Sequence, residues 1–483
     1  MSDPIQPGAL RSSLIDLAQA HGIRLLTDPA DMAAYLTDWR GKWTGRALAV
    51  AQPDRVEQVM ALMRWCHRHR VPVVPQGGNT GLSGGATPDA SGTALVLSLR
   101  RLRRVREVDP INNTLTVEAG LSLLEVQQAA EAAGRLFPLS LAAEGSCTIG
   151  GNLATNAGGV QVLRHGNARE LCLGLEVVTA EGERWSGLRG LRKDNTGYDL
   201  RDLYIGSEGT LGVITAAVLK LVPPPVARLA AFVSVASPAD AVGLLQRAQA
   251  ALGARLTACE LLSDTCLSLV ERHMPACRSP LSQRSPWYVL IELSEPRDEA
   301  DAQAALESLL ADAMDADLVQ DAVVSTSLAQ FEALWALREN ISEAQGAEGR
   351  TIKHDIALPI SRIAEYLATT EVAFRTRWPT LRRVTFGHLG DGNLHDNVSP
   401  PADRCGPPGS DDAAWFLGHE AELNRCIHDA VAERGGSISA EHGLGVLRRD
   451  EAARYKSPVE RALQASIKQA LDPLGIMNPG KVV

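Results

Sequence analysis

Two histidines flank a glycine-rich turn in the stretch TFGHLGDGNLHDNV, residues 385–398. The Gly-Asp-Gly-Asn run between His388 and His395 predicts a tight reversal, which would bring both imidazoles to one side, as a divalent metal requires. Two imidazoles and a carboxylate suit Zn²⁺, while Mn²⁺, Co²⁺ and Fe²⁺ stay open. The alternative is a pair of structural histidines satisfied within the fold. Asp391 and Asn393 are expected to form the turn and not to bind metal.

A carboxylate and a third imidazole stand side by side in GGSISAEHGLG, residues 435–445. Neighbouring side chains on a regular strand point to opposite faces, so Glu441 and His442 could not both reach one ion from a strand. An irregular loop between glycines would relax this restriction. Otherwise one of the two residues has a different role.

Three glycine-rich loops predict an anion-binding or dinucleotide-binding domain. They are PQGGNTGLSGG at 75–85, TIGGNLATNAGG at 148–159 and GSEGTLGVIT at 206–215. Glycine allows close approach of the backbone, so successive N–H groups can surround a phosphate. None of the loops matches the Walker or G-x-G-x-x-G pattern. Three such loops in one predicted domain suggest a single extended ligand, for which a dinucleotide fits better than a lone phosphate.

The elements that would position these residues follow from the apolar pattern. From Val56 to Cys66 apolar side chains recur at helical spacing, which predicts a helix that ends within HRHR (67–70), and VPVVP (71–75) predicts a short strand that leads into the first glycine loop. LSLLEVQQAAEAAG predicts a helix that ends at Gly134. After the prolines at 223–225, strand-like and helix-like runs alternate, which is typical of an antiparallel sheet covered by helices.

The composition excludes several function classes. With a formal charge of −9 and no basic runs, the chain is not expected to bind nucleic acid or an anionic membrane. No apolar stretch reaches the roughly 18 residues of a membrane span, and the N-terminus resembles neither a secretory signal nor a transit peptide. The 8 cysteines show no C-x-x-C spacing, so reduced thiols in a cytoplasmic protein are expected.

Taken in order, six motifs resemble one family. These are PQGGNTGLSGG, FPLSLAAEGSCTIGGNLATNAGG, LRKDNTGYDLRDLYIGSEGTLGVIT, HLGDGNLH, ISAEHGLG and NPGK. They are similar to motifs of the FAD-linked oxidases of the vanillyl-alcohol oxidase superfamily, and within it to the enzymes that oxidise D-2-hydroxyglutarate, D-lactate or glycolate. The resemblance covers about residues 30–483.

The resemblance implies an α+β fold: a FAD-binding domain of vanillyl-alcohol oxidase type over 1–222, and a substrate (cap) domain over 223–440 with an antiparallel sheet covered by helices. A C-terminal segment, 441–483, would return to the flavin. Asn79 and Thr80 stand where some relatives attach flavin through a histidine, so FAD is expected to be non-covalent. The implied FAD-binding residues are Pro75, Gly77, Gly78, Asn79, Thr80, Gly81, Leu82, Pro138, Ser140, Glu144, Gly145, Thr148, Gly150, Gly151, Asn152, Thr155, Gly158, Gly159, Ile214 and Asn478.

The resemblance also assigns the remaining site residues. His388, His395 and Glu441 would bind a divalent metal, most simply Zn²⁺, and His442 would be the catalytic base beside it. Arg338 and Ser342, four apart on one predicted helical face, would bind the substrate together with the residues Lys353, Asn397 and His442. His354, beside Lys353, has no role that the family suggests.

The expected function is oxidation of a D-2-hydroxy acid by hydride transfer to flavin N5. Two cations and a metal suit a diacid, so D-2-hydroxyglutarate, giving 2-oxoglutarate, is the first substrate, and D-lactate or D-malate the alternative. The expected acceptor is a protein or quinone-linked carrier, such as an electron-transfer flavoprotein, and a homodimer stays open. Two other classes remain: a metal-dependent hydrolase, which leaves the glycine loops unexplained, and a non-catalytic nucleotide-binding module, which leaves the histidines unexplained.

Overall fold

The structure, a computed structural model, describes residues 7–483 and contains two compact units. Unit 1 consists of 1–158, 166–223 and 441–483, of which residues 7 onward are described. Unit 2 consists of 159–165 and 224–440. The sequence-based domains differ in two ways: they left 1–222 undivided, without the piece 159–165, and they set 441–483 apart, whereas it belongs to unit 1. Among residues 7–483, no helix is long and apolar enough to cross a membrane.

Unit 1 has two sheets. A four-stranded sheet has the order β1-β2-β4-β3, and a five-stranded antiparallel sheet has the order β5-β6-β9-β7-β8. The strands are β1 (Arg24–Leu26), β2 (Ala49–Gln52), β3 (Val73–Gln76), β4 (Leu95–Ser98), β5 (Val105–Asp109), β6 (Thr114–Glu118), β7 (Cys172–Val178), β8 (Arg184–Ser186) and β9 (Val213–Lys220). The helices are α1 (Pro7–His21), α2 (Pro29–Leu36), α3 (Val56–His69), α4 (Leu123–Ala132), α5 (Ile149–Ala154), α7 (Leu200–Tyr204), α16 (Arg449–Tyr455) and α17 (Pro458–Leu471).

Local sequence explains how two of these helices are bounded. Ser122 and Glu125 form a reciprocal capping box at the start of α4, and Gly134 follows its end with a φ of +67°. The amphipathic α3 ends at His69, as the helical spacing predicts. The chain then enters β3, which delivers the first glycine loop.

The C-terminal segment completes the smaller sheet of unit 1. Met477 pairs in parallel with Val73 of β3, and the Asn478 N–H donates to the Val73 carbonyl at 2.7 Å. Ile476 and Met477 are buried in the same core as β3 and β4. Residues 476 and 477 are therefore part of the core of this unit.

Unit 2 is built on a seven-stranded antiparallel sheet with the order β13-β10-β12-β11-β15-β16-β14. The strands are β10 (Ala227–Val235), β11 (Leu256–Ser263), β12 (Trp287–Glu295), β13 (Asp321–Val324), β14 (Asp355–Ala357), β15 (Arg382–His388) and β16 (Asn393–Ser399). The helices are α6 (Val162–His165), α8 (Pro238–Leu252), α9 (Asp264–His273), α10 (Glu299–Asp315), α11 (Leu328–Glu339), α12 (Ile341–Ala347), α13 (Ile363–Arg377), α14 (Asp411–Leu417) and α15 (Glu420–Ala432).

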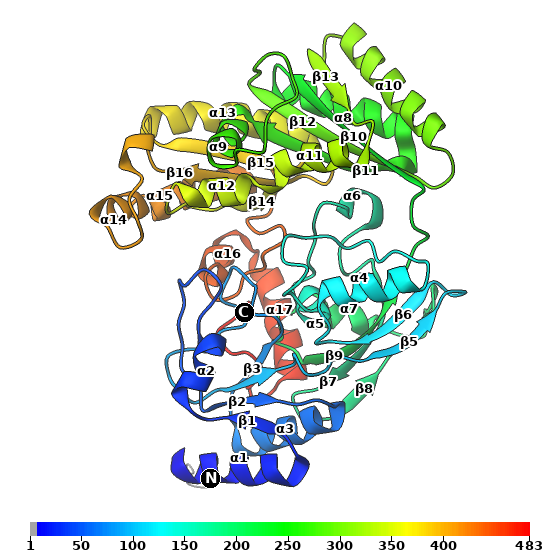
Figure 1. Ribbon diagram of the computed structural model, residues 1–483. Helices are drawn as coiled ribbons and strands as arrows, with labels where there is room; N and C mark the ends of the chain where they lie inside the picture. Colours follow the sequence, from blue (N-terminus) through cyan, green and yellow to red (C-terminus); the bar gives the residue numbers. More distant parts are fainter. Residues whose placement is uncertain (1–6) are drawn as a thin grey trace. The chain divides into compact units, whose positions relative to one another are not determined.

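Helices cover both faces of this sheet (Figure 1). Side chains of α8, α10, α13 and α15 form one core with the sheet, while α9, α11 and α12 form a second core on its other face. The α+β class and the antiparallel sheet covered by helices are thus confirmed. The face under α9, α11 and α12 carries the polar side chains described below.

Candidate functional site

The three glycine loops meet in one cavity of unit 1. The predicted residues that line it are Pro75, Gly77, Gly78, Asn79, Thr80, Gly81, Thr148, Gly150, Gly151, Asn152, Thr155 and Ile214. Ser207, Glu208 and Gly209 line it from the third loop, and so does His442 from the C-terminal segment. Ser83 and His442, which are 359 positions apart in the sequence, therefore line the same cavity.

The remaining residues predicted to bind FAD are not among those that line this cavity. Leu82, Pro138, Ser140, Glu144, Gly145, Gly158 and Asn478 belong to unit 1 but do not line the cavity, and Gly159 belongs to unit 2. Ser140 and Glu144 are hydrogen-bonded to each other at 2.7 Å in the loop before the second glycine run. Asn478 is buried, and its amide donates to the carbonyls of Gly85 and Glu208, so it braces two loops of the cavity.

The first two loops pack so closely that only glycine fits at two positions. A Cβ on Gly77 would lie 2.2 Å from Thr148 Oγ1, and one on Gly78 would lie 2.1 Å from the Ser146 carbonyl oxygen. Asn79 has a φ of +55°, a conformation that asparagine tolerates better than bulky residues do. Within the described part of the chain, the buried Thr148 Oγ1 has no hydrogen-bond partner. A glycine cradle with an unsatisfied hydroxyl fits the phosphates and hydroxyls of a dinucleotide.

Glu208 holds the loop that carries His442. Its carboxylate accepts the N–H groups of Leu444 at 2.8 Å and Gly445 at 2.9 Å, and Ser83 Oγ donates to the His442 carbonyl at 3.2 Å. Burial raises the pKa of Glu208, while the two backbone N–H donors lower it. Sequence reasoning missed this role, although Glu208 lies at the centre of the third glycine loop.

Cys147 lines the cavity as a packed thiol. It is buried, and Asn152 Nδ2 lies 3.6 Å from its sulfur. Burial raises the pKa of this thiol. A buried neutral thiol of this kind is a poor nucleophile.

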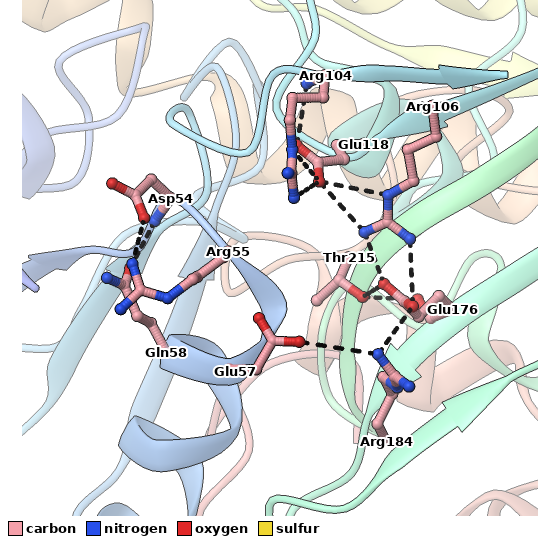
Figure 2. Close-up of polar contacts among 10 residues, drawn as sticks. All are labelled: Asp54, Arg55, Glu57, Gln58, Arg104, Arg106, Glu118, Glu176, Arg184 and Thr215. Atoms are coloured by element: carbon pink, nitrogen blue, oxygen red, sulfur yellow. Dashed lines mark hydrogen bonds and ion pairs between the residues drawn. The ribbon is translucent and has the colours of Figure 1, made fainter. Parts of the chain in front are cut away.

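A network of ion pairs around two buried carboxylates, Glu118 and Glu176, lies on the five-stranded sheet (Figure 2). Arg106 of β5 donates to Glu118 of β6 at 3.3 Å and to Glu176 of β7 at 3.0 Å. Thr215 of β9 also donates to Glu176, at 2.9 Å. Ala119 and Ile214, next in the chain to Glu118 and Thr215, line the cavity. The network therefore ties together the strands that form the cavity wall.

The histidine pair lies in unit 2 at the end of a hairpin. Pairing of β15 with β16 sets His388 opposite Asn393 and Phe386 opposite His395, so both imidazoles are diagonal neighbours on one face. Their ring centroids are 5.8 Å apart, and ligand nitrogens of the two rings lie within 4.8 Å of each other. The predicted reversal is thus confirmed, and the pair is close enough for one ion.

Each of these histidines faces a buried carboxylate through Nδ1. His388 Nδ1 lies 2.7 Å from Glu260 Oε1, and His395 Nδ1 lies 3.9 Å from Asp355 Oδ1. A carboxylate only accepts hydrogen bonds, so it favours a proton on Nδ1 and a lone pair on Nε2. Between the histidines, Asp391 accepts the Asn393 N–H at 3.0 Å, as a turn-forming residue does. Burial raises the pKa of Asp391 to about 6.

Arg338 reaches the same face of the sheet from α11. Its Nε donates to Glu260 Oε2 at 2.7 Å, and its guanidinium carbon lies 4.8 Å from the centre of the Phe386 ring. Burial alone would raise the pKa of Glu260, but His388 and Arg338 outweigh burial and lower it to about 2. The two Nη groups of Arg338 carry four further N–H donors. A bidentate pair with a carboxylate needs two of them.

Arg338 and Ser342 do not share a helical face, contrary to the sequence-based prediction. Asn340 separates α11 from α12, and its side-chain amide donates to the Ala336 carbonyl at 2.8 Å. Asn340 has a φ of −77° and a ψ of −2°, which marks the junction between the two helices. Arg338 is consequently buried, whereas Ser342 is exposed.

Lys353 and Asn397 lie near the histidines on neighbouring strands. Lys353 precedes β14 by two residues, and Asn397 follows His395 by two on β16, so strand alternation places both on the histidine side. Asn397 donates to Gln345 Oε1 at 3.0 Å and accepts the His354 N–H at 3.1 Å. The His354 ring contacts the Asp396 carbonyl and Asn424, both at 2.9 Å, so this histidine is a structural one.

Glu441 directly follows the last residue of unit 2. The preceding Ala440 donates its N–H to the Asp355 carbonyl at 3.2 Å, and Asp355 pairs with His395 across β14 and β16. Glu441 itself begins the third segment of unit 1, one residue before His442. The predicted carboxylate thus stands where the chain leaves the histidine-bearing sheet.

Two family models match the chain. The description "FAD binding domain" applies to residues 47–186, and "FAD linked oxidases, C-terminal domain" applies to residues 224–482. The first match includes two of the glycine loops, and the second includes the histidine pair, Glu441 and His442.

Similar sequences and structures agree with these matches. The chain is 40% identical over 474 residues to the D-2-hydroxyglutarate dehydrogenase of Xanthomonas citri pv. viticola, covering 97% of this chain and 96% of that protein. It is 38% identical over 461 residues to the mitochondrial D-2-hydroxyglutarate dehydrogenase of Bos taurus, covering 95% and 81%. Among solved structures, p-cresol methylhydroxylase (TM-score 0.75, 16% identity, 98% and 96% covered) and alkyldihydroxyacetonephosphate synthase (0.71, 18%, 99% and 86%) share the fold.

Proposed function

The chain belongs to the FAD-linked oxidases, and on this premise we propose that it is an FAD- and divalent-metal-dependent dehydrogenase of D-2-hydroxy acids. The observation that carries the proposal is the position of His442, which lines the same cavity as the three glycine loops. A titratable imidazole beside a dinucleotide site is what oxidation of an alcohol requires. A metal-dependent hydrolase would have no use for that cavity.

FAD would be held by residues that this chain supplies without a covalent bond. The cradle of Gly77 and Gly78 would take the pyrophosphate, and Thr148 Oγ1 would find its hydrogen-bond partner in the cofactor. Asn79 and Thr80 line the cavity on the first loop, and neither is a histidine. We therefore propose a dissociable FAD.

The metal would be held by His388, His395 and Glu441. The two imidazoles present nitrogens within 4.8 Å of each other, and Glu441 follows the residue that hydrogen-bonds to Asp355. Two imidazoles and a carboxylate are a donor set that suits Zn²⁺. When bound, the divalent cation would lower the pKa of the substrate hydroxyl and FAD would accept the hydride at N5. His442 would then take the hydroxyl proton as a neutral base.

D-2-hydroxyglutarate is the proposed substrate, with 2-oxoglutarate as the product. The two relatives described above carry that substrate in their names, and Arg338 and Lys353 lie on the histidine side of the sheet in unit 2. Two cations suit two carboxylates, so a diacid should bind better than D-lactate, and D-malate is the nearest competitor. We propose a protein or quinone-linked carrier as the electron acceptor.

An anaerobic flavin titration tests this function. Purified enzyme would be mixed without oxygen with D-2-hydroxyglutarate, D-malate, D-lactate and their L-enantiomers. Reduction of the flavin would be followed as the loss of its absorbance at about 450 nm. D-2-hydroxyglutarate should bleach the flavin at the lowest concentration. A protein without extractable flavin, or one whose flavin no hydroxy acid reduces, would contradict the proposal.

A further inference from the structure

Glu260 is a buried carboxylate in a strand that is otherwise almost wholly apolar. It lies on β11 in the run LTACELLS, is 1% exposed, and stands directly opposite His388 in the pairing of β11 with β15. Its two oxygens contact different partners, His388 through Oε1 and Arg338 through Oε2, each at 2.7 Å. One carboxylate therefore connects a proposed metal ligand with a proposed substrate-binding cation.

We propose that Glu260 is a positioning residue that fixes His388 for the metal and Arg338 for a substrate carboxylate at the same time. The inference rests on the proposed function and goes beyond it, because Glu260 touches neither ligand itself. Its role is to hold two side chains in the orientations that the ligands need.

The contact with His388 selects the tautomer of the neutral imidazole. Because the carboxylate accepts the Nδ1 proton, the neutral ring carries its lone pair on Nε2, which is the nitrogen that a metal would bind. Rotation of the ring would break a 2.7 Å hydrogen bond to a buried charge. The imidazole is thus held in one tautomer and one orientation.

The contact with Arg338 leaves the end of the guanidinium for recognition. Glu260 accepts from Nε, on the side of the fork, so the Nη groups remain as the donors that meet a carboxylate in a bidentate pair. The guanidinium carbon packs against the Phe386 ring, 4.8 Å from the ring centroid. The centroid of the same ring lies 4.9 Å from that of the His395 ring. Arg338 is thereby directed to the side of the sheet that carries both histidines.

Stability alone does not require a charged residue at this position. A buried ion pair is often no more stable than apolar side chains of similar size. Glu292 on β12 makes a useful comparison, because it lies on the same face, is also 1% exposed, and pairs with an arginine, Arg228, at 3.1 Å. Its described partners are not histidines or Arg338, so it provides a matched control.

The test is Glu260→Gln in the holoenzyme, with Glu292→Gln as the control. Glutamine replaces one carboxylate oxygen with an NH₂ donor, so it cannot accept from His388 at one oxygen and from Arg338 at the other. Zn²⁺ affinity would be measured by competition with a chromogenic chelator, and KM for D-2-hydroxyglutarate and for D-lactate by steady-state kinetics. We expect Glu260→Gln to weaken Zn²⁺ binding by about 10–100-fold and to raise KM for the diacid more than for D-lactate. Glu292→Gln should leave the Zn²⁺ affinity and the KM ratio unchanged.

A second variant separates the two contacts. Arg338→Met keeps the Glu260–His388 hydrogen bond, so it should raise KM for the diacid while the Zn²⁺ affinity stays within about twofold. If Glu260→Gln does not fold, Glu260→Asp replaces it, because a side chain one methylene shorter cannot keep both contacts. A folded Glu260 variant with unchanged Zn²⁺ affinity and unchanged KM ratio overturns the inference. A wild-type protein that binds no stoichiometric Zn²⁺ overturns the proposed metal function instead.

Discussion

At the scale of single residues, the sequence predicted functional side chains that belong to a local motif. It did not predict side chains whose role depends on a partner far away in the sequence. His388 and His395 could be predicted because a short turn joins them. Glu260 could not, because 128 residues separate it from His388 and only strand pairing brings them together. A signal was present in hindsight: an isolated acid in the apolar run LTACELLS must have a buried partner. Glu208, inside a recognised glycine loop, could have been found in the same way.

Gly78→Ala tests the glycine cradle at this scale. The new methyl would lie 2.1 Å from the Ser146 carbonyl oxygen, so the loops must separate, at a cost of about 1–3 kcal/mol. We expect the apoprotein to unfold at lower denaturant concentration and FAD affinity to fall, as measured by denaturant titration and flavin fluorescence.

Gly81→Ala is the matched control in the same loop. A Cβ at Gly81 meets no described protein atom within 4 Å. The apoprotein should therefore keep its stability, and any loss of FAD affinity would report close approach of the cofactor itself. Equal destabilisation of the apoprotein by both substitutions would argue against the packing described for Gly78.

At the scale of helices and strands, periodicity identified the elements but not their long-range pairing. The strand before the first glycine loop and the helix that ends before Gly134 lie where the apolar pattern predicts them. The break at Asn340 was missed because the apolar spacing continues through it, from the buried Leu337 to the buried Ile341 and Ala344. The ion network on β5, β6 and β7 was also missed, because its members pair across strands.

Arg106→Met tests that network. The substitution would leave Glu118 and Glu176, two buried carboxylates, without the arginine that bridges them. The Arg106 side chain is 24% exposed and Glu118 keeps its contact with Arg104, so we expect a loss of about 1–3 kcal/mol and a clear fall of the denaturant midpoint. Arg104→Met is the control: this arginine also contacts Glu118, but its side chain is 66% exposed. The control should cost less than about 1 kcal/mol, and comparable losses from both variants would contradict a special role for Arg106.

At the scale of the whole molecule, the glycine loops and the histidine pair belong to different units, each with its own core. The sequence indicated this division through the prolines at 223–225 and the change in pattern after them. It did not indicate that residues 159–165 leave unit 1 and pack in unit 2, where Leu163 meets Gly390 of the histidine turn. That contact joins positions more than two hundred residues apart, which local patterns cannot report.

His388→Ala tests the division between the units. The substitution removes a proposed metal ligand from unit 2, whereas the cavity with the glycine loops belongs to unit 1. We expect bound metal and most turnover to be lost while FAD stays at one equivalent, measured by elemental analysis beside the flavin spectrum. Loss of metal and flavin together would mean that the two sites depend on each other.

The return of the C-terminus to β3 has a consequence for biosynthesis. A ribosome has delivered every residue of unit 2 once position 440 has emerged, so the seven-stranded sheet can fold while translation continues. The four-stranded sheet of unit 1 is not yet complete at that point, because residues 476–478 have still to be synthesised. Their backbone hydrogen bonds to Val73 complete the sheet. A chain truncated before Ile476 would therefore contain the whole of unit 2 but lack the backbone bonds that complete the four-stranded sheet of unit 1.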